Sequence, residues 1–229
     1  MENVSVFTMI LNAFSQGGIW MWAILAIQIV SMAIIAERVI QLYLLRKPSQ
    51  RKWVSQLEGP IRSGNFQQAL SLTHGGRRNP IGRVVSAGLK SAQSMSGKED
   101  IRSRMDELLL VENEKLDKRT GFLAMLGNVG TLLGLLGTIV GLIAAFASVS
   151  ALDPVEKSSM LTKGISMAMN TTAYGLIMAI PALVMYAVLQ NRSESLKQDL
   201  NQAAFRAFNW MNFNFDQVGK KSAKKPLGN

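Results

Sequence analysis

Three long runs of apolar residues dominate the hydropathy pattern of this chain. They cover residues 19–45, 122–149 and 164–189, and the last two contain no charged side chain. At about 1.5 Å per helical residue, each run is long enough to cross a hydrocarbon core about 30 Å thick. The pattern predicts an all-α membrane protein with transmembrane helices at 17–45, 120–149 and 164–189.

The first run has the flanking residues of a membrane span. Trp20 and Trp22 stand at one end, and Tyr43, Arg46 and Lys47 at the other, which is typical of membrane interfaces. A secretory signal peptide is the competing interpretation. It is disfavoured because no Lys or Arg precedes the run, and because the run exceeds a signal peptide's apolar region.

The segments between and beyond the spans also have helical periodicity. In the region 46–119, Trp53, Leu57 and Ile61 recur at every fourth position, and the stretch from Lys98 onward is expected to continue into the second span as one long helix. The third span should likewise run on into 190–229, where an apolar stripe comprises Leu196, Leu200, Ala203 and Ala207. Residues 1–16 place one apolar face on a predicted interfacial helix, formed by Val4, Phe7, Ile10, Leu11 and Phe14.

The net charge of +10 is unevenly distributed along the chain. Residues 46–119 contain 15 Lys and Arg against 8 Asp and Glu, and residues 190–229 contain 7 against 3. The positive-inside rule places both regions in the cytoplasm, so the N-terminus and the loop 150–163 are expected in the periplasm of a bacterial inner membrane. Anionic membrane lipid accounts for the basic surface, and no nucleic-acid partner is expected.

Composition argues against an enzyme. The chain has no cysteine, which excludes thiol chemistry and disulfides, and its single histidine, His74, lies in a Gly- and Arg-rich segment. We expect no catalytic residues, no metal site and no cofactor.

Small residues form stripes on the second and third spans. Gly127, Gly130, Gly134, Gly137 and Gly141 recur at spacings of three and four, and the third span has Ala168, Thr172, Gly175, Ala179 and Ala182 in a similar pattern. Such stripes allow membrane helices to approach closely, and tight packing is the simplest interpretation of the glycines. Pro181 is expected to kink the third helix.

Polar side chains accompany these stripes. Thr131 and Thr138 lie beside the glycines, and Asn170, Thr171 and Thr172 follow one another on the third span. A membrane threonine often bonds only to its own helix, but the pairing of Thr138 with Thr172 suggests an ion pathway. Glu37 ends the first span, where it could anchor the helix, guide ions, or pair with a basic residue of another subunit.

These residues resemble the membrane signatures of the MotA/TolQ/ExbB family, and the ExbB/TolQ branch most closely. The resemblance lies in Leu132–Leu142 with Thr138 and Gly141, in Gly164–Ala168 and in Thr172–Ala182 with Gly175 and Pro181. Supporting matches are Glu37-Arg38, Asn79-Pro80 and Gly88-Leu89.

The resemblance implies a homopentamer around a central lumen that holds a dimer of a single-span ExbD/TolR-like protein. An aspartate on each partner helix would be protonated by inward-moving H⁺, and the proton motive force would turn one ring against the other. Thr138 and Thr172 match the family threonines that face this aspartate. A TonB/TolA-like protein is a further partner that the resemblance suggests.

One position departs from the family pattern. ExbB- and TolQ-like chains often carry a glutamate five residues before the second threonine, whereas this chain has Met167. The run from Thr171 to Gly175 also resembles sodium-driven flagellar stators, so Na⁺ is the alternative to H⁺. A solute transporter and a passive membrane scaffold are rival functions, but a transporter would need a buried charge or an inverted repeat, and a scaffold leaves the threonines unexplained.

Overall fold

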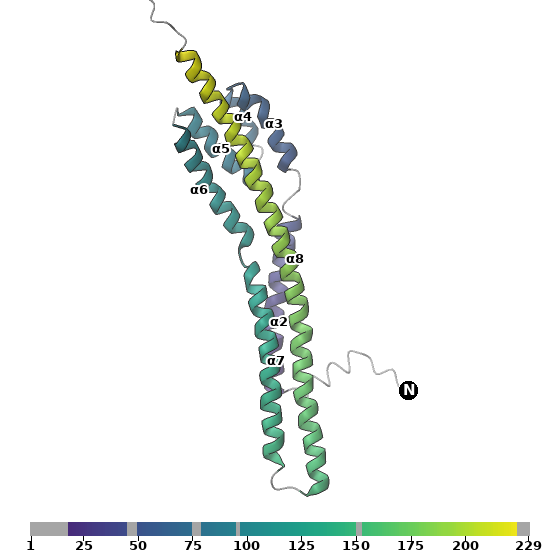
Figure 1. The fold of residues 1–229 in the computed structure, drawn as a ribbon. Helices are drawn as coiled ribbons and strands as arrows, with labels where there is room; N and C mark the ends of the chain where they lie inside the picture. Colours follow the sequence, from purple (N-terminus) through teal and green to yellow (C-terminus); the bar gives the residue numbers. More distant parts are fainter. Residues whose placement is uncertain (1–17, 45–49, 75–78, 95–96, 150–152, 224–229) are drawn as a thin grey trace, which may run out of the picture. The chain divides into compact units, whose positions relative to one another are not determined.

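The described chain is entirely helical. The computed structural model describes residues 18–44, 50–74, 79–94, 97–149 and 153–223, and within these ranges it contains no strand. Figure 1 shows the helices, which are α2 (Gly18–Val39), the π-helical segment η1 (Ile40–Leu44), α3 (Gln50–Arg62), α4 (Phe66–His74), α5 (Pro80–Gln93), α6 (Lys98–Asp117), α7 (Thr120–Ser148) and α8 (Pro154–Ala223). The predicted interfacial helix at 1–16 lies outside the described residues.

Three helical stretches of the described ranges are long and apolar enough to cross a membrane. One is formed by α2 and η1, one contains α7, and one lies within α8. The described residues therefore confirm the predicted all-α fold with three candidate membrane-spanning helices.

The chain divides into two compact units. Unit 1 comprises the described residues up to Val39 together with Arg119–Leu189, and unit 2 comprises Ile40–Lys118 together with the described residues from Gln190. Helix α8 contributes its first part to unit 1 and its remainder to unit 2.

Unit 1 contains the three apolar helices. Helix α7 packs against α2 on one side and, through its glycine stripe, against α8. The contacts pair Gly127 with Leu183 and Gly141 with Ala168, so α7 and α8 run antiparallel. Large apolar side chains on the outer face of α7 stay exposed, including Leu132 at 62% and Ile143 at 64%, as expected for surfaces that meet lipid or other membrane helices.

Unit 2 has its own hydrophobic core, which involves α3, α4, α5, α6 and α8. Helix α5 begins with Pro80, whose fixed φ suits the first helical position, and buries Ile81, Val84, Val85 and Leu89 on one face. Gly88 brings this helix close to α6 and α8, because an added Cβ would lie 2.8 Å from Met105 Cγ and 3.3 Å from Met211 Cε.

The structure corrects the prediction that one helix runs from Lys98 into the second span. Helix α6 ends at Asp117 and α7 begins at Thr120, because Arg119 takes the left-handed conformation with φ of 64°. Neither Gly nor Pro stands at 118–120 to mark this break. The sequence at these three positions therefore contained no helix-breaking residue that would have predicted the break.

Helix α8 begins ahead of the third predicted span, within the segment 150–163 that was expected to connect the second and third spans. Helix α8 already begins at Pro154, and the Lys157 amide donates to the Asp153 carbonyl at 2.9 Å. Proline at the first helical position and Glu156 in the first turn both favour a helix start here. The helix also continues through Pro181.

Candidate ion-pathway site

The glycine stripe brings the backbones of α7 and α8 close together. A Cβ added to Gly134 would lie 3.3 Å from the Cα atoms of both Gly175 and Thr172, and one added to Gly175 would lie 2.9 Å from the Gly130 carbonyl oxygen. Backbone atoms cannot swing away as the end of a side chain can. A residue larger than glycine at position 134 or 175 would therefore push the two helices apart.

The other predicted packing residues lie along the same contact. Gly137 is covered by the Thr171 methyl group, and Gly130 lies under Met178. A Cβ on Gly127 would lie 2.8 Å from Leu183 Cγ, and one on Gly141 would lie 3.2 Å from Ala168 Cβ. Pro181, which was predicted to shape this region, is exposed.

Thr138 and Thr172 meet at the α7–α8 contact, next to the closest approach of the two backbones. Thr172 Oγ1 donates to the Gly134 carbonyl at 2.9 Å and lies 3.4 Å from Thr138 Oγ1. Thr138 Oγ1 donates to the Leu135 carbonyl of its own helix at 2.5 Å. With both protons directed to carbonyls, each hydroxyl oxygen keeps lone pairs for water or a cation.

The remaining candidate hydroxyls bond within their own helices. Thr131 Oγ1 donates to the Gly127 carbonyl at 3.1 Å, and Thr171 Oγ1 donates to the Met167 carbonyl at 2.9 Å. Thr171 is buried, whereas Asn170 is half-buried. The structure thus brings Thr138 and Thr172 together, and it packs the methyl group of Thr171 on Gly137.

Glu37 lies near the C-terminal end of α2 and pairs with a basic residue of its own chain. Arg119 Nη1 donates to Glu37 Oε2 at 2.7 Å, with side chains that are 50% and 35% exposed, respectively. Arg119 is the left-handed residue just before α7. The ion pair therefore joins the end of α2 to the start of α7, away from the threonine pair.

Sequence reasoning missed a polar contact on the opposite side of α8. Tyr174 Oη donates to Gln28 Oε1 of α2 at 2.6 Å. The available signal was Gln28 itself, an amide side chain in the middle of the mainly apolar stretch 19–36.

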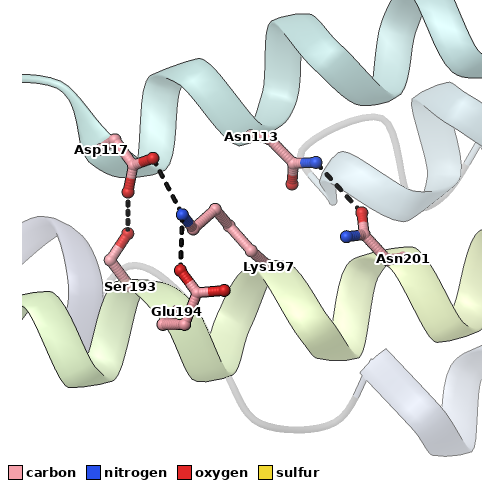
Figure 2. A network of polar contacts seen from close by, with 6 residues as sticks. All are labelled: Asn113, Asp117, Ser193, Glu194, Lys197 and Asn201. Atoms are coloured by element: carbon pink, nitrogen blue, oxygen red, sulfur yellow. Dashed lines mark hydrogen bonds and ion pairs between the residues drawn. The ribbon is translucent and has the colours of Figure 1, made fainter.

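A second polar cluster that the sequence did not reveal lies in unit 2 (Figure 2). Lys197 Nζ on α8 lies 2.9 Å from Asp117 Oδ2 at the end of α6 and 2.6 Å from Glu194 Oε2, while Ser193 donates to Asp117 Oδ1 at 3.0 Å. One turn away, Asn113 donates to Asn201 at 3.0 Å. Lys197 lies beyond the apolar stretch of α8, and the hydrogen bonds to Glu194 and then Asp117 raise the pKa of its ammonium group above 10.5.

The described residues contain no group of His, Cys, Asp and Glu side chains suited to hold a metal ion. The oxygen atoms at the α7–α8 contact come from hydroxyls and backbone carbonyls. Such oxygens can hydrate a proton or ligate a hard monovalent cation.

The geometry is accompanied by a clear sequence relationship. A sequence model of the MotA/TolQ/ExbB proton channel family matches residues 77–202, more than half of the chain, including the threonine pair and its glycine contacts. The chain belongs to the MotA/TolQ/ExbB proton channel family. The resemblance drawn from the sequence is thus confirmed.

Two relatives support this assignment at low identity. A protein described as a putative biopolymer transport protein ExbB homologue, from Methanothermobacter thermautotrophicus, is 25% identical over 190 residues, which cover 82% of this chain and 66% of the relative. The biopolymer transport protein ExbB of Pseudomonas putida is 28% identical over 126 residues, which cover 55% of this chain and 38% of the relative. The chain therefore spans less than two thirds of the length of either relative.

Proposed function

We propose that this chain is the ion-channel subunit of an ExbB/TolQ-like rotary motor in a bacterial inner membrane. Five copies would surround a dimer of a single-span ExbD/TolR-like partner, and inward proton flow would drive work on the envelope, with a TonB/TolA-like protein as a candidate recipient. Family membership supports this proposal, and so does the exposed apolar surface of α7, which suits further membrane helices.

The observation that carries the proposal is the hydroxyl pair at the α7–α8 contact. Thr172 bonds across to α7 and lies 3.4 Å from Thr138, within two runs of residues that contain no charged side chain. An ionised carboxylate at mid-membrane costs at least about 2.5 to 3.5 kcal/mol. A partner aspartate at this level would need the water and hydroxyl oxygens that the pair can organise.

Replacement of Thr172 by Val tests this role. Valine keeps the shape of threonine but removes the hydroxyl. A hydrogen bond to a charged group contributes about 1.5 to 3 kcal/mol, so we expect ion flux to fall by about tenfold or more. Flux is measured in liposomes that contain the chain co-expressed with the single-span protein of a neighbouring gene, under an imposed proton gradient in sodium-free buffer.

Two variants serve as controls. Thr172→Ser retains the hydroxyl and should keep partial flux. Thr162→Val removes a hydroxyl that bonds to the Ser158 carbonyl of α8 at 2.8 Å, and should behave as the unmodified protein. Native mass spectrometry should find five copies of this chain with two of the partner in every case, and normal flux with Thr172→Val would refute the site.

A sodium-driven motor is the second candidate, and the thioether of Met167, at the position where ExbB- and TolQ-like chains often carry a glutamate, favours it. The side chain is half-buried and reaches Gly18, the first residue of α2, so that an added Cβ on Gly18 would lie 2.6 Å from Met167 Cε. A thioether cannot relay a proton as a carboxylate does. Full flux in sodium-free buffer would exclude obligatory sodium coupling, and flux that requires added Na⁺ would exclude the proton.

A further inference from the structure

Tyr174 and Gln28 form a polar contact between the apolar parts of α8 and α2. The phenol donates to the amide oxygen at 2.6 Å, across 146 residues of sequence, and both side chains are half-buried. A polar group inside a hydrocarbon layer is costly to leave without a partner. The contact should therefore persist in the assembled protein.

Tyr174 and Thr172 leave α8 on opposite sides at nearly the same level. Two residues correspond to about 200° of rotation in an α-helix. Thr172 reaches the Gly134 carbonyl of α7, whereas Tyr174 reaches Gln28 of α2. Helix α8 is thus held on both sides by directional bonds.

The other contacts that this part of α8 makes with α7 and α2 have less directional character. The contact with α7 consists mainly of small residues and apolar groups, and Met167 meets Gly18 through a flexible thioether. Within a bilayer, no hydrophobic driving force holds one helix in a single orientation against another. Van der Waals packing and hydrogen bonds then fix how α8 is rotated about its own axis, and of these two the hydrogen bonds are the directional contacts.

We propose that Tyr174 and Gln28 are positioning residues for the threonine pair. Their bond sets the rotation of α8, and that rotation determines where Thr172 presents its oxygen to the passing ion. The inference rests on the proposed role of Thr172 in ion passage, and it predicts an effect on how well the ion is bound rather than on how much protein assembles.

The test uses Tyr174→Phe and Gln28→Met in the same partner-containing liposomes. Both variants keep the side-chain volume nearly constant and remove the bond from one side. We expect the ion concentration that gives half-maximal flux to shift by about threefold, the size expected of one hydrogen bond between membrane helices. The double variant should shift it no further than either single variant. Tyr186→Phe, the same chemical change elsewhere on α8, is the matched control and should leave the value unchanged.

The outcomes separate this inference from the proposed function. An unchanged half-maximal concentration in Tyr174→Phe overturns the positioning role, even where maximal flux falls with the amount of assembled protein. If Tyr174→Phe fails to assemble, the half-maximal concentration of Gln28→Met is the test, because this variant leaves α8 unaltered. If neither variant assembles, the contact has a folding role, and the inference is also overturned. Normal flux in Thr172→Val refutes the ion pathway itself, whereas a defect in Thr172→Val with normal ion dependence in Tyr174→Phe refutes positioning alone.

Discussion

Gly134 and Gly175 lie where α7 and α8 approach each other most closely through their backbones. A methyl group on either residue would press on backbone atoms of the other helix at 2.9 to 3.3 Å. Real Cβ atoms seldom come so close, and backbone atoms cannot rotate away. Because Thr172 bonds to the Gly134 carbonyl, widening this contact would also disturb the threonine pair.

The prediction at this scale is that Gly175→Ala destabilises the membrane unit. Forcing an extra methyl into a filled contact costs about 1 to 3 kcal/mol, although alanine favours a helix by about 1 kcal/mol over glycine. Gly121→Ala is the control, since nothing lies within 4 Å of its added Cβ, and it should unfold at the same temperature or higher. Thermal unfolding in detergent, followed by circular dichroism, compares the two, and a Gly175→Ala protein as stable as Gly121→Ala would contradict the packing described here.

At the scale of elements, the polar cluster of Figure 2 connects the end of α6 to α8 within unit 2 through hydrogen bonds and ion pairs. Lys197 is only 18% exposed and bonds both Asp117 and Glu194. By contrast, Arg104 and Glu107 form a pair at 3.6 Å with both side chains 68% exposed. Exposed pairs contribute about 0 to 1 kcal/mol, so the two positions should respond differently to the loss of their charge.

We expect Lys197→Met to lower the free energy of unfolding by about 1 kcal/mol or more, and Arg104→Met to change it by less than about 0.5 kcal/mol. Because the raised pKa favours the charged form in the folded state, the stabilisation by Lys197 is complete below pH 10.5 and declines as the pH rises through the folded-state pKa. The loss of this stabilisation is measured by chemical denaturation of the wild type and both variants between about pH 7 and 11, a range that includes the usual lysine pKa. A difference between wild type and Lys197→Met that already vanishes at about pH 8, well below that pKa, would contradict the proposed ion-pair origin.

For the whole molecule, the positive-inside rule predicts that residues 150–163 and residues 46–119 lie on opposite sides of the membrane. Ser159 is exposed near the start of α8, and Ser103 is exposed on α6. Because the chain contains no cysteine, single cysteines at these positions can be labelled without background.

We predict that Ser159→Cys reacts with a membrane-impermeant maleimide in spheroplasts, and that Ser103→Cys reacts only after the membrane is permeabilised. The expectation follows from the excess of Lys and Arg in residues 46–119. Labelling is measured as a mass shift of the purified chain, and the cysteine-free wild-type protein is the negative control. Reaction of Ser103→Cys in intact spheroplasts would reverse the topology.

The sequence by itself determined the helical class, the three apolar spans and the family. These properties depend on composition and spacing within short segments, such as the uncharged run at 122–149, which indicates a span whatever surrounds it. The small-residue stripes could be found in the same way, because helical periodicity alone places Gly134 and Gly141 on one face.

The tertiary structure decided which groups meet. Thr172 bonds to a carbonyl 38 residues away, Tyr174 to an amide 146 residues away, and Glu37 to Arg119 across 82 residues. Periodicity shows which side of a helix a residue lies on, but it contains no information on the helix that covers that side. The break at Arg119 likewise depends on backbone conformation at a residue that is neither Gly nor Pro. Partner choice follows from the packing of distant helices, and for that reason the threonine pair could be suspected from the sequence but its hydrogen bonds could not.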